Sequence, residues 1–295
     1  MKKVKKAVIP AAGLGTRFFP ATKTIPKEML PIVDKPTMLY VIEEAVQAGI
    51  EDIVLIQGRG KTAIEDFFDI SYELEDKLIK DGKGYLIDEI NKIRNSVNII
   101  SIRQKSALGL GHAIKCAESV TGQDPFAILL GDEITLSSSP ETNITKHLIQ
   151  KTEQTGASSV WVLPVQKSDT HKYGIVDLKD PSATDLKDGR KVFGVVEKPK
   201  PDAAPSLWAL PGRYVFTSEI LECLKELKPG YNGEYQLSDA MNRLAAISNL
   251  NAYSFNARRF DAGDKLGFLL ANIEVALERE DLREGLLQYI RSKQI

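Results

Sequence analysis

The stretch Ala7-Val8-Ile9-Pro10-Ala11-Ala12-Gly13-Leu14-Gly15-Thr16-Arg17 places a glycine loop directly after a short apolar run. The run is typical of a buried strand, and the small loop residues let backbone N–H groups approach an anion closely. The loop does not match a dinucleotide-binding motif, because Phe18 stands at the position of the third glycine. It also lacks the Gly-Lys-Ser/Thr sequence that ends a P-loop. Arg17, followed by Lys23 and Lys27, instead favours a loop that binds a polyphosphate.

Short apolar runs alternate with helical patterns through the first half of the chain. Residues 53–56 and 126–130 are predicted as buried strands, and apolar residues recur at helical spacing over residues 38–48 until Gly49. This alternation is typical of parallel strands joined by crossover helices. We therefore predict an α/β fold, with a Rossmann-like, mixed and mostly parallel central sheet flanked by helices.

The remaining chain is predicted to add helices and short strands to this sheet. Interleaved acids, bases and apolar residues over 61–95 indicate an insertion of amphipathic helices between two strands. Beyond residue 157, short strands and turns suggest an antiparallel or mixed extension of the sheet. Further helices are expected over 218–227, 234–247 and 264–279, followed by a helical tail.

We expect a main domain over residues 1–263 and a C-terminal helical segment over 264–295. That segment would pack on the main domain or lie at an oligomer interface. The stripe of apolar residues on its first helix fits either a core or an interface, and a core is the default interpretation. The stripe consists of Leu266, Leu269, Leu270, Ile273, Val275 and Leu277.

Composition excludes several classes of protein. Of the 295 residues, 39 are Lys or Arg and 40 are Asp or Glu, so no global positive field attracts nucleic acid or an anionic membrane. Cys116 and Cys223 form neither a disulfide framework nor a cysteine zinc motif. No run reaches the roughly 18 apolar residues of a membrane-spanning helix. These features favour a cytoplasmic protein.

Two aspartates are candidate metal ligands. Asp132 follows the strand at 126–130, so it should emerge at the carboxyl edge of the sheet, where ligands bind in open α/β folds. A carboxylate there can hold Mg²⁺, although an aspartate after a strand is equally common as a turn or helix cap. Asp261 also ends a β-like run.

Several spaced motifs together resemble the sugar-1-phosphate nucleotidylyltransferase family. The glycine loop is followed, in the order of that family, by the four segments Pro26-Lys27-Glu28-Met29-Leu30-Pro31, Leu108-Gly109-Leu110-Gly111-His112-Ala113, Glu197-Lys198-Pro199-Lys200-Pro201 and Gly212-Arg213-Tyr214. The match covers nearly the whole chain and looks most like the uridylyl-transferring branch. It implies a nucleotidyltransferase catalytic domain over residues 1–263.

The resemblance implies roles for residues at the nucleotide end of the site. Arg17 and Lys27 would hold the triphosphate, and Gln104 with Gly109 would recognise the base. For Gln104 the alternative is an exposed residue at a strand end, and for Gly109 a simple turn. The remaining residues implied to contact the nucleotide are Ala11, Ala12, Gly13 and Gly15.

The resemblance also implies which residues bind the sugar phosphate and the metal. Gly174 and Glu197 would contact the sugar and Lys198 its phosphate, although an exposed Glu-Lys pair is the ordinary alternative. Asp132 and Asp261 would hold Mg²⁺. Relatives often carry Asp where this chain has Glu133, so any role of that residue is in doubt. The other residues considered are Glu234, which would help to shape the sugar pocket, and His112, expected to be structural.

The implied reaction joins UTP and α-D-glucose 1-phosphate to give UDP-glucose and pyrophosphate, by in-line attack on the α-phosphorus without a covalent intermediate. One alternative is a thymidylyltransferase that uses dTTP. Another is a catalytically silent, sugar-nucleotide-binding regulatory subunit. Relatives form dimers or tetramers, so the resemblance also implies a homo-oligomer.

Overall fold

The computed structural model describes residues 2–136, 142–230 and 233–293, and its centre is a mixed sheet. Strands β1 (Lys6–Ala11), β4 (Asp52–Gln57), β5 (Asn98–Arg103) and β6 (Phe126–Leu129) form its parallel part, in the order β5-β4-β1-β6. The predicted strands at 53–56 and 126–130 are therefore confirmed.

Beyond β6 the sheet continues mainly with antiparallel pairs. Strand β13 (Arg213–Phe216) runs antiparallel to both β6 and β8 (Ser158–Trp161), and β14 (Leu250–Tyr253) is parallel to β8. The far edge consists of β11 (Arg190–Glu197), β10 (Gly174–Leu178), β12 (Trp208–Leu210) and β9 (Leu163–Pro164). Within the described residues this makes a sheet of 11 strands, and the predicted mixed α/β fold is confirmed. The sheet is not mostly parallel as expected, because four of its ten neighbouring strand pairs are parallel and the short strands of the second half add six antiparallel pairs.

The alternation of side chains along the strands divides the core into two layers. Val8, Val54 and Ile56 face one layer, whereas Ile9, Ile53 and Leu55 face the other, because successive residues of a strand point to opposite faces. The first layer is completed by α5 (Leu110–Cys116), α8 (Glu219–Lys225) and α9 (Leu237–Ile247), and the second by α1 (Thr37–Gln47) and α7 (Ile144–Thr155).

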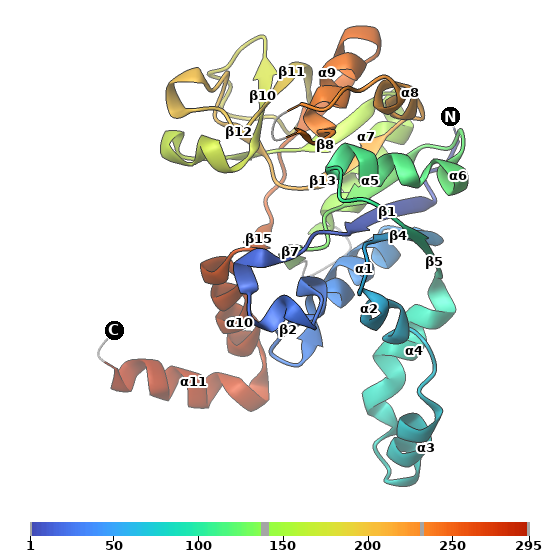
Figure 1. Ribbon diagram of the computed structural model, residues 1–295. Coiled ribbons are helices and arrows are strands. Elements are labelled where there is room, and N and C mark those ends of the chain that lie inside the picture. Colours follow the sequence, from blue (N-terminus) through green and yellow to red (C-terminus); the bar gives the residue numbers. More distant parts are fainter. Residues whose placement is uncertain (1, 137–141, 231–232, 294–295) are drawn as a thin grey trace.

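The insertion between β4 and β5 is helical, as predicted for residues 61–95. It contains α2 (Thr62–Asp66), α3 (Tyr72–Lys80), the 3₁₀ turn η4 (Gly84–Ile87) and α4 (Asp88–Ser96). In Figure 1 this segment projects from one side of the sheet. Most of its charged residues are exposed, whereas Arg94 and Glu75 form an ion pair whose side chains are each 14% exposed.

The C-terminal segment consists of α10 (Lys265–Glu278) and α11 (Glu280–Ser292), and α11 extends away from the sheet in Figure 1. The default interpretation of its apolar stripe as core is wrong for Leu266, Leu269 and Leu270, which are 64, 55 and 45% exposed. A further difference is that the helix expected from residue 234 begins at Leu237, because Gln236 is extended backbone. The division into domains at residue 263 stays a prediction.

Two small strand pairs lie beside the main sheet. Strand β7 (Glu133–Leu136) pairs antiparallel with β15 (Arg258–Asp261), and β2 (Pro31–Ile32) pairs with β3 (Lys35–Pro36). The β7–β15 pairing joins segments that are far apart in sequence, and it places Asp261 opposite Glu133. Across the described ranges, no helix has both the length and the apolar character needed to cross a membrane.

Candidate active site

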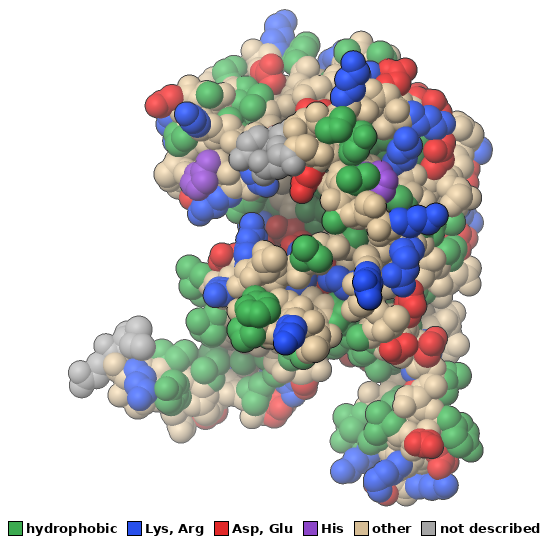
Figure 2. All heavy atoms as spheres, in the orientation of Figure 1, with side chains coloured by type: hydrophobic (Ala, Val, Ile, Leu, Met, Phe, Trp, Pro, Cys, Tyr) green, Lys and Arg blue, Asp and Glu red, His purple; other side chains and the backbone are tan. Residues whose placement is uncertain are grey.

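A cavity of about 790 Å³ opens beyond the carboxyl end of β6, between β10–β11 and the β7–β15 pair. Figure 2 shows the molecule hollowed at this place, with charged side chains around the opening. The location agrees with the rule that open α/β folds bind ligands at the carboxyl edge of the sheet. Of the residues expected in the site, the cavity is lined by Arg17, Asp132, Gly174, Glu197, Lys198, Glu234 and Asp261.

The glycine loop after β1 is held in a tight turn at the edge of this cavity. Gly15 has a φ of 66°, a conformation that favours glycine, and its carbonyl accepts a hydrogen bond from Thr22 Oγ1 at 2.7 Å. Arg17 follows in a 3₁₀ turn, and its guanidinium donates to the Gly263 carbonyl at 3.3 Å. The loop thus contacts the segment that carries Asp261.

Lys27 begins a 3₁₀ turn, Lys27–Met29, and the second residue of this turn is buried. Glu28 is 1% exposed and pairs with Lys61 at 2.7 Å, which anchors the turn. Lys27 Nζ then lies 2.5 Å from Asp132 Oδ2. Burial alone would lower the pKa of Lys27, but the charges of Asp132 and Glu28 raise it, so the ammonium stays protonated.

Asp132 and Asp261 approach the same point of the cavity wall. A Cβ atom built on Gly263 would lie 2.5 Å from Asp132 Oδ2 and 3.0 Å from Asp261 Oδ1, so a side chain there would displace the two carboxylates. Burial, and then the like charge of Asp132, raise the pKa of Asp261. Two converging carboxylates that repel each other fit a divalent cation with oxygen ligands. In the described part of the chain, no cluster of three or more His, Cys, Asp or Glu residues forms a larger metal site.

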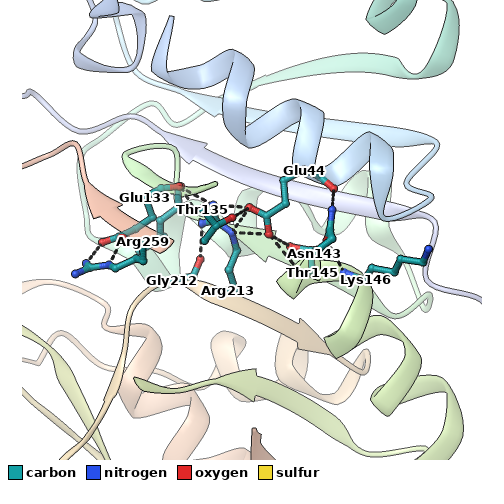
Figure 3. Close-up of polar contacts among 10 residues, drawn as sticks. Glu44, Glu133, Thr135, Asn143, Thr145, Lys146, Gly212, Arg213 and Arg259 are labelled. Atoms are coloured by element: carbon teal, nitrogen blue, oxygen red, sulfur yellow. Dashed lines mark hydrogen bonds and ion pairs between the residues drawn. The ribbon is translucent and has the colours of Figure 1, made fainter. Parts of the chain in front are cut away.

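Glu133 and Arg259 hold the two aspartates together, a role that the sequence did not reveal. Arg259 donates two hydrogen bonds to the Glu133 carboxylate at 2.5 and 2.7 Å, and a third to the Tyr173 hydroxyl at 3.0 Å (Figure 3 shows the first two). Arg259 and Asp261 lie two residues apart on β15, which places them on one face. The two-residue spacing of Arg259 and Asp261 could have indicated from the sequence that they share a face. It could not have indicated that Arg259 binds Glu133, because that contact depends on the pairing of β7 with β15.

The residues expected to bind the sugar phosphate lie on neighbouring strands. Gly174 pairs with Glu197 in the β10–β11 register, and a Cβ atom on Gly174 would lie 3.4 Å from Glu197 Oε2. Lys198 has a φ of 47°, an uncommon value for a residue with a side chain, and its N–H donates to the Tyr173 carbonyl at 3.0 Å. Such backbone strain is often found at functional sites.

The residues expected to recognise the base lie together beyond β5. Gln104 is 6% exposed, and its amide nitrogen donates to the Gly109 carbonyl at 3.2 Å. Gly109 has a φ of 98°, and a Cβ atom there would lie 2.8 Å from the Glu234 side chain. The loop therefore packs against the segment that precedes α9. In the motif at that segment, Tyr231 and Asn232 lie outside the described residues.

Comparison with known proteins identifies similar chains along the whole length. The model of the nucleotidyl transferase family matches residues 6–276. A UTP–glucose-1-phosphate uridylyltransferase of Bacillus subtilis is 49% identical over 98% of this chain and 97% of its own length. The corresponding protein of Staphylococcus epidermidis is 48% identical over all of both chains.

Solved structures agree with this similarity. A UDP-glucose pyrophosphorylase from Acinetobacter baumannii has a TM-score of 0.89 at 40% identity, covering 98% of this chain and 99% of its own. A UTP-bound structure from the same organism has a TM-score of 0.88 at 41% identity, covering 97 and 98%. The chain therefore belongs to the nucleotidyl transferase family, in the group that contains the UTP–glucose-1-phosphate uridylyltransferases.

Proposed function

We propose that this protein catalyses the formation of UDP-glucose and pyrophosphate from UTP and α-D-glucose 1-phosphate. The observation that carries the proposal is the cavity at which Arg17, Asp132 and Asp261 face Glu197 and Lys198. A basic group for a polyphosphate, two carboxylates and groups for a sugar phosphate thus share one space. The similarity to UTP–glucose-1-phosphate uridylyltransferases along almost the whole chain supports the identity of the substrates.

The nucleophile in this reaction is a sugar phosphate oxygen that is already ionised. The barrier therefore comes from bringing two polyanions together in line and from charge on the transition state. Arg17 and Lys27 hold the triphosphate and the leaving pyrophosphate, and Lys198 holds the attacking phosphate. Glu197 accepts hydrogen bonds from sugar hydroxyls, and no covalent intermediate is required.

The metal in the proposed reaction is Mg²⁺, with Asp132 and Asp261 as its protein ligands. When bound, the ion supplies positive charge to the phosphate oxygens. The convergence of the two carboxylates beside Gly263 supports this assignment. Lys27, which pairs with Asp132 at 2.5 Å, keeps that carboxylate ionised, because its charge lowers the Asp132 pKa against the effect of burial.

The experiment is an assay of pyrophosphate release from the purified protein with glucose 1-phosphate. UTP, dTTP, ATP, CTP and GTP are compared, each with Mg²⁺ and with EDTA. We expect release with UTP that requires Mg²⁺. A preference for dTTP would assign the protein to the thymidylyl branch. Nucleotide binding without release for any sugar phosphate would favour a regulatory subunit and contradict the proposal.

We also propose that the protein is a cytoplasmic homo-oligomer, a dimer or tetramer. The exposed side chains of Leu266, Leu269 and Leu270 on α10 support an apolar contact between copies. Light scattering coupled to size-exclusion chromatography tests this assembly. A Leu266→Lys/Leu270→Lys variant should shift the mass toward the monomer, and an unchanged mass would exclude this face.

A further inference from the structure

The side-chain amide of Gln104 is fixed by two acceptors of the chain itself. Its nitrogen lies 3.2 Å from the Gly109 carbonyl oxygen and 2.9 Å from His112 Nδ1. A carbonyl oxygen can only accept, so the amide atom that faces Gly109 must be the NH₂ group. The same group faces His112, and the two hydrogens of the amide are therefore both used.

This geometry also fixes the state of His112. Nδ1 accepts a hydrogen bond from Gln104, so the proton of the ring is on Nε2 and the imidazole is neutral. Partial burial, together with the charge of Lys115, lowers the pKa of His112 and is consistent with this state. The expectation that His112 is structural agrees with this neutral state, because the chemistry needs no general base.

The loop that carries these groups is held in place from the other side. The N–H of Gly111 donates to the Tyr235 carbonyl at 2.8 Å, and the N–H of Tyr235 donates to the Leu108 carbonyl at 2.8 Å. His112, on the first turn of α5, thus has a fixed position relative to Gln104 at the end of β5. The hydrogen bond between the two side chains is built into the fold.

With both hydrogens used, the Gln104 side chain has only an acceptor left. Among the described residues, no donor contacts its Oε1, and that atom is not completely enclosed. An acceptor matches the N3–H of uracil, whereas cytosine has a lone pair at N3 and would be repelled. The amide orientation therefore decides which pyrimidine fits.

We propose that His112 is a positioning residue that fixes the Gln104 amide with its oxygen toward the base, so that the site accepts a pyrimidine with N3–H and rejects cytosine. The inference rests on the proposed function, and it takes Gln104 as the base contact that the family resemblance implies. It adds that Gln104 and His112 together determine which pyrimidine base the site accepts. Without His112 the amide can rotate and offer its NH₂ group to cytosine N3.

The experiment compares kcat/KM for UTP and CTP at saturating glucose 1-phosphate in four variants. We expect His112→Ala to reduce the preference for UTP over CTP by about tenfold or more, since a buried donor loses its partner. The change should appear in KM for the nucleotides, as a rise for UTP and a fall for CTP, with KM for glucose 1-phosphate unchanged. His112→Asn, whose Oδ1 can accept in place of Nδ1, should restore most of the preference. Cys116→Ala, on the same helix, is the matched control and should leave it unchanged.

The fourth variant, Gln104→Leu, separates the two levels of the proposal. If Gln104→Leu removes the preference but His112→Ala keeps it, the positioning role is overturned and the base contact stands. If neither change alters the preference, Gln104 does not face the base, and the base contact implied by the resemblance fails together with the positioning role. If His112→Ala does not fold, His112→Asn alone decides the question. A preference for UTP over CTP equal to that of the wild type then supports the inference, and loss of this preference in folded His112→Asn contradicts it.

Discussion

Two groups of charged side chains meet strand β7, one along its length and one at its start. Along the strand, Glu44 and Arg213 form a pair whose side chains are 3 and 1% exposed (Figure 3). The carboxylate accepts hydrogen bonds from Arg213, Thr135 and Thr145, and the guanidinium also donates to the Glu133 carbonyl at 2.6 Å. The hydrogen-bonding capacity of this pair is filled from within the chain.

The group at the start of β7 is different. The side chains of Asp132 and Asp261 are 25 and 29% exposed, and they face each other with Lys27 beside Asp132. Here like charges are brought together, and Asp261 resists ionisation. Charged side chains whose hydrogen bonds are all made within the chain hold its strands together. Charged side chains with fewer partners of their own are available to bind a ligand.

The largest expected effect comes from Asp132→Asn, which removes a charge from the second group. We expect turnover to fall by at least about a thousandfold, equivalent to ~4 kcal/mol in the barrier, because charge stabilisation dominates this chemistry. The thermal midpoint should change little, because the side chain is partly exposed and the asparagine amide has the same size as the carboxylate it replaces. Steady-state assays and thermal melts measure both. Asp124→Asn, at a partly exposed aspartate that pairs with Lys2 and Lys6, is the control and should leave turnover unchanged.

Removing Glu44 tests the other side of the comparison. We expect Glu44→Ala to lower the free energy of unfolding by about 3 kcal/mol, because Arg213 is left as an unpaired buried charge. Denaturant unfolding measures the loss. The double variant Glu44→Leu/Arg213→Met should be more stable than Glu44→Ala, since neither charge then remains buried. If the double variant were the less stable of the two, desolvation would not govern this pair.

The sequence predicted the parts of the site that depend on local pattern. Asp132 was placed at the carboxyl edge of the sheet because a buried apolar run, 126–130, directly precedes it, and the structure has β6 there. The helical insertion at 61–95 followed from its mixed charges in the same way. Such features can be predicted because they depend only on the spacing of apolar and polar residues within one strand or helix.

Features that depend on distant partners could not be predicted. Nothing near Arg213 in the sequence indicates that it pairs with Glu44, or that β15 brings Arg259 to Glu133. The stripe on α10 has the helical spacing of a core helix, yet Leu266 is exposed, because apolar spacing does not specify what the helix packs against. These contacts are fixed by the tertiary arrangement.

A smaller effect is expected in the pH dependence of stability. Burial alone would raise the pKa of Glu44, but the charge and hydrogen bonds of Arg213 keep it below its usual value of 4.5. The folded state therefore binds this proton less readily than the unfolded chain, and the stabilisation is lost as pH falls through the folded pKa. The difference in unfolding free energy between wild type and Glu44→Gln should be constant near neutral pH and shrink in acid. A difference independent of pH would contradict the assignment.

The smallest effect is expected at a charged pair that belongs to neither group. Lys80 and Asp76 form an ion pair at 2.6 Å on α3, one helical turn apart, with side chains 73 and 38% exposed. The acid lies on the N-terminal side and the base in the last turn, an arrangement that favours the helix. Even so, Lys80→Ala should lower the free energy of unfolding by no more than ~0.5 kcal/mol, because water and salt screen the pair. Denaturant unfolding beside Glu44→Ala provides the measurement. A loss as large as that of the buried pair would mean that short ion-pair distances, and not burial, determine which charges hold this fold together.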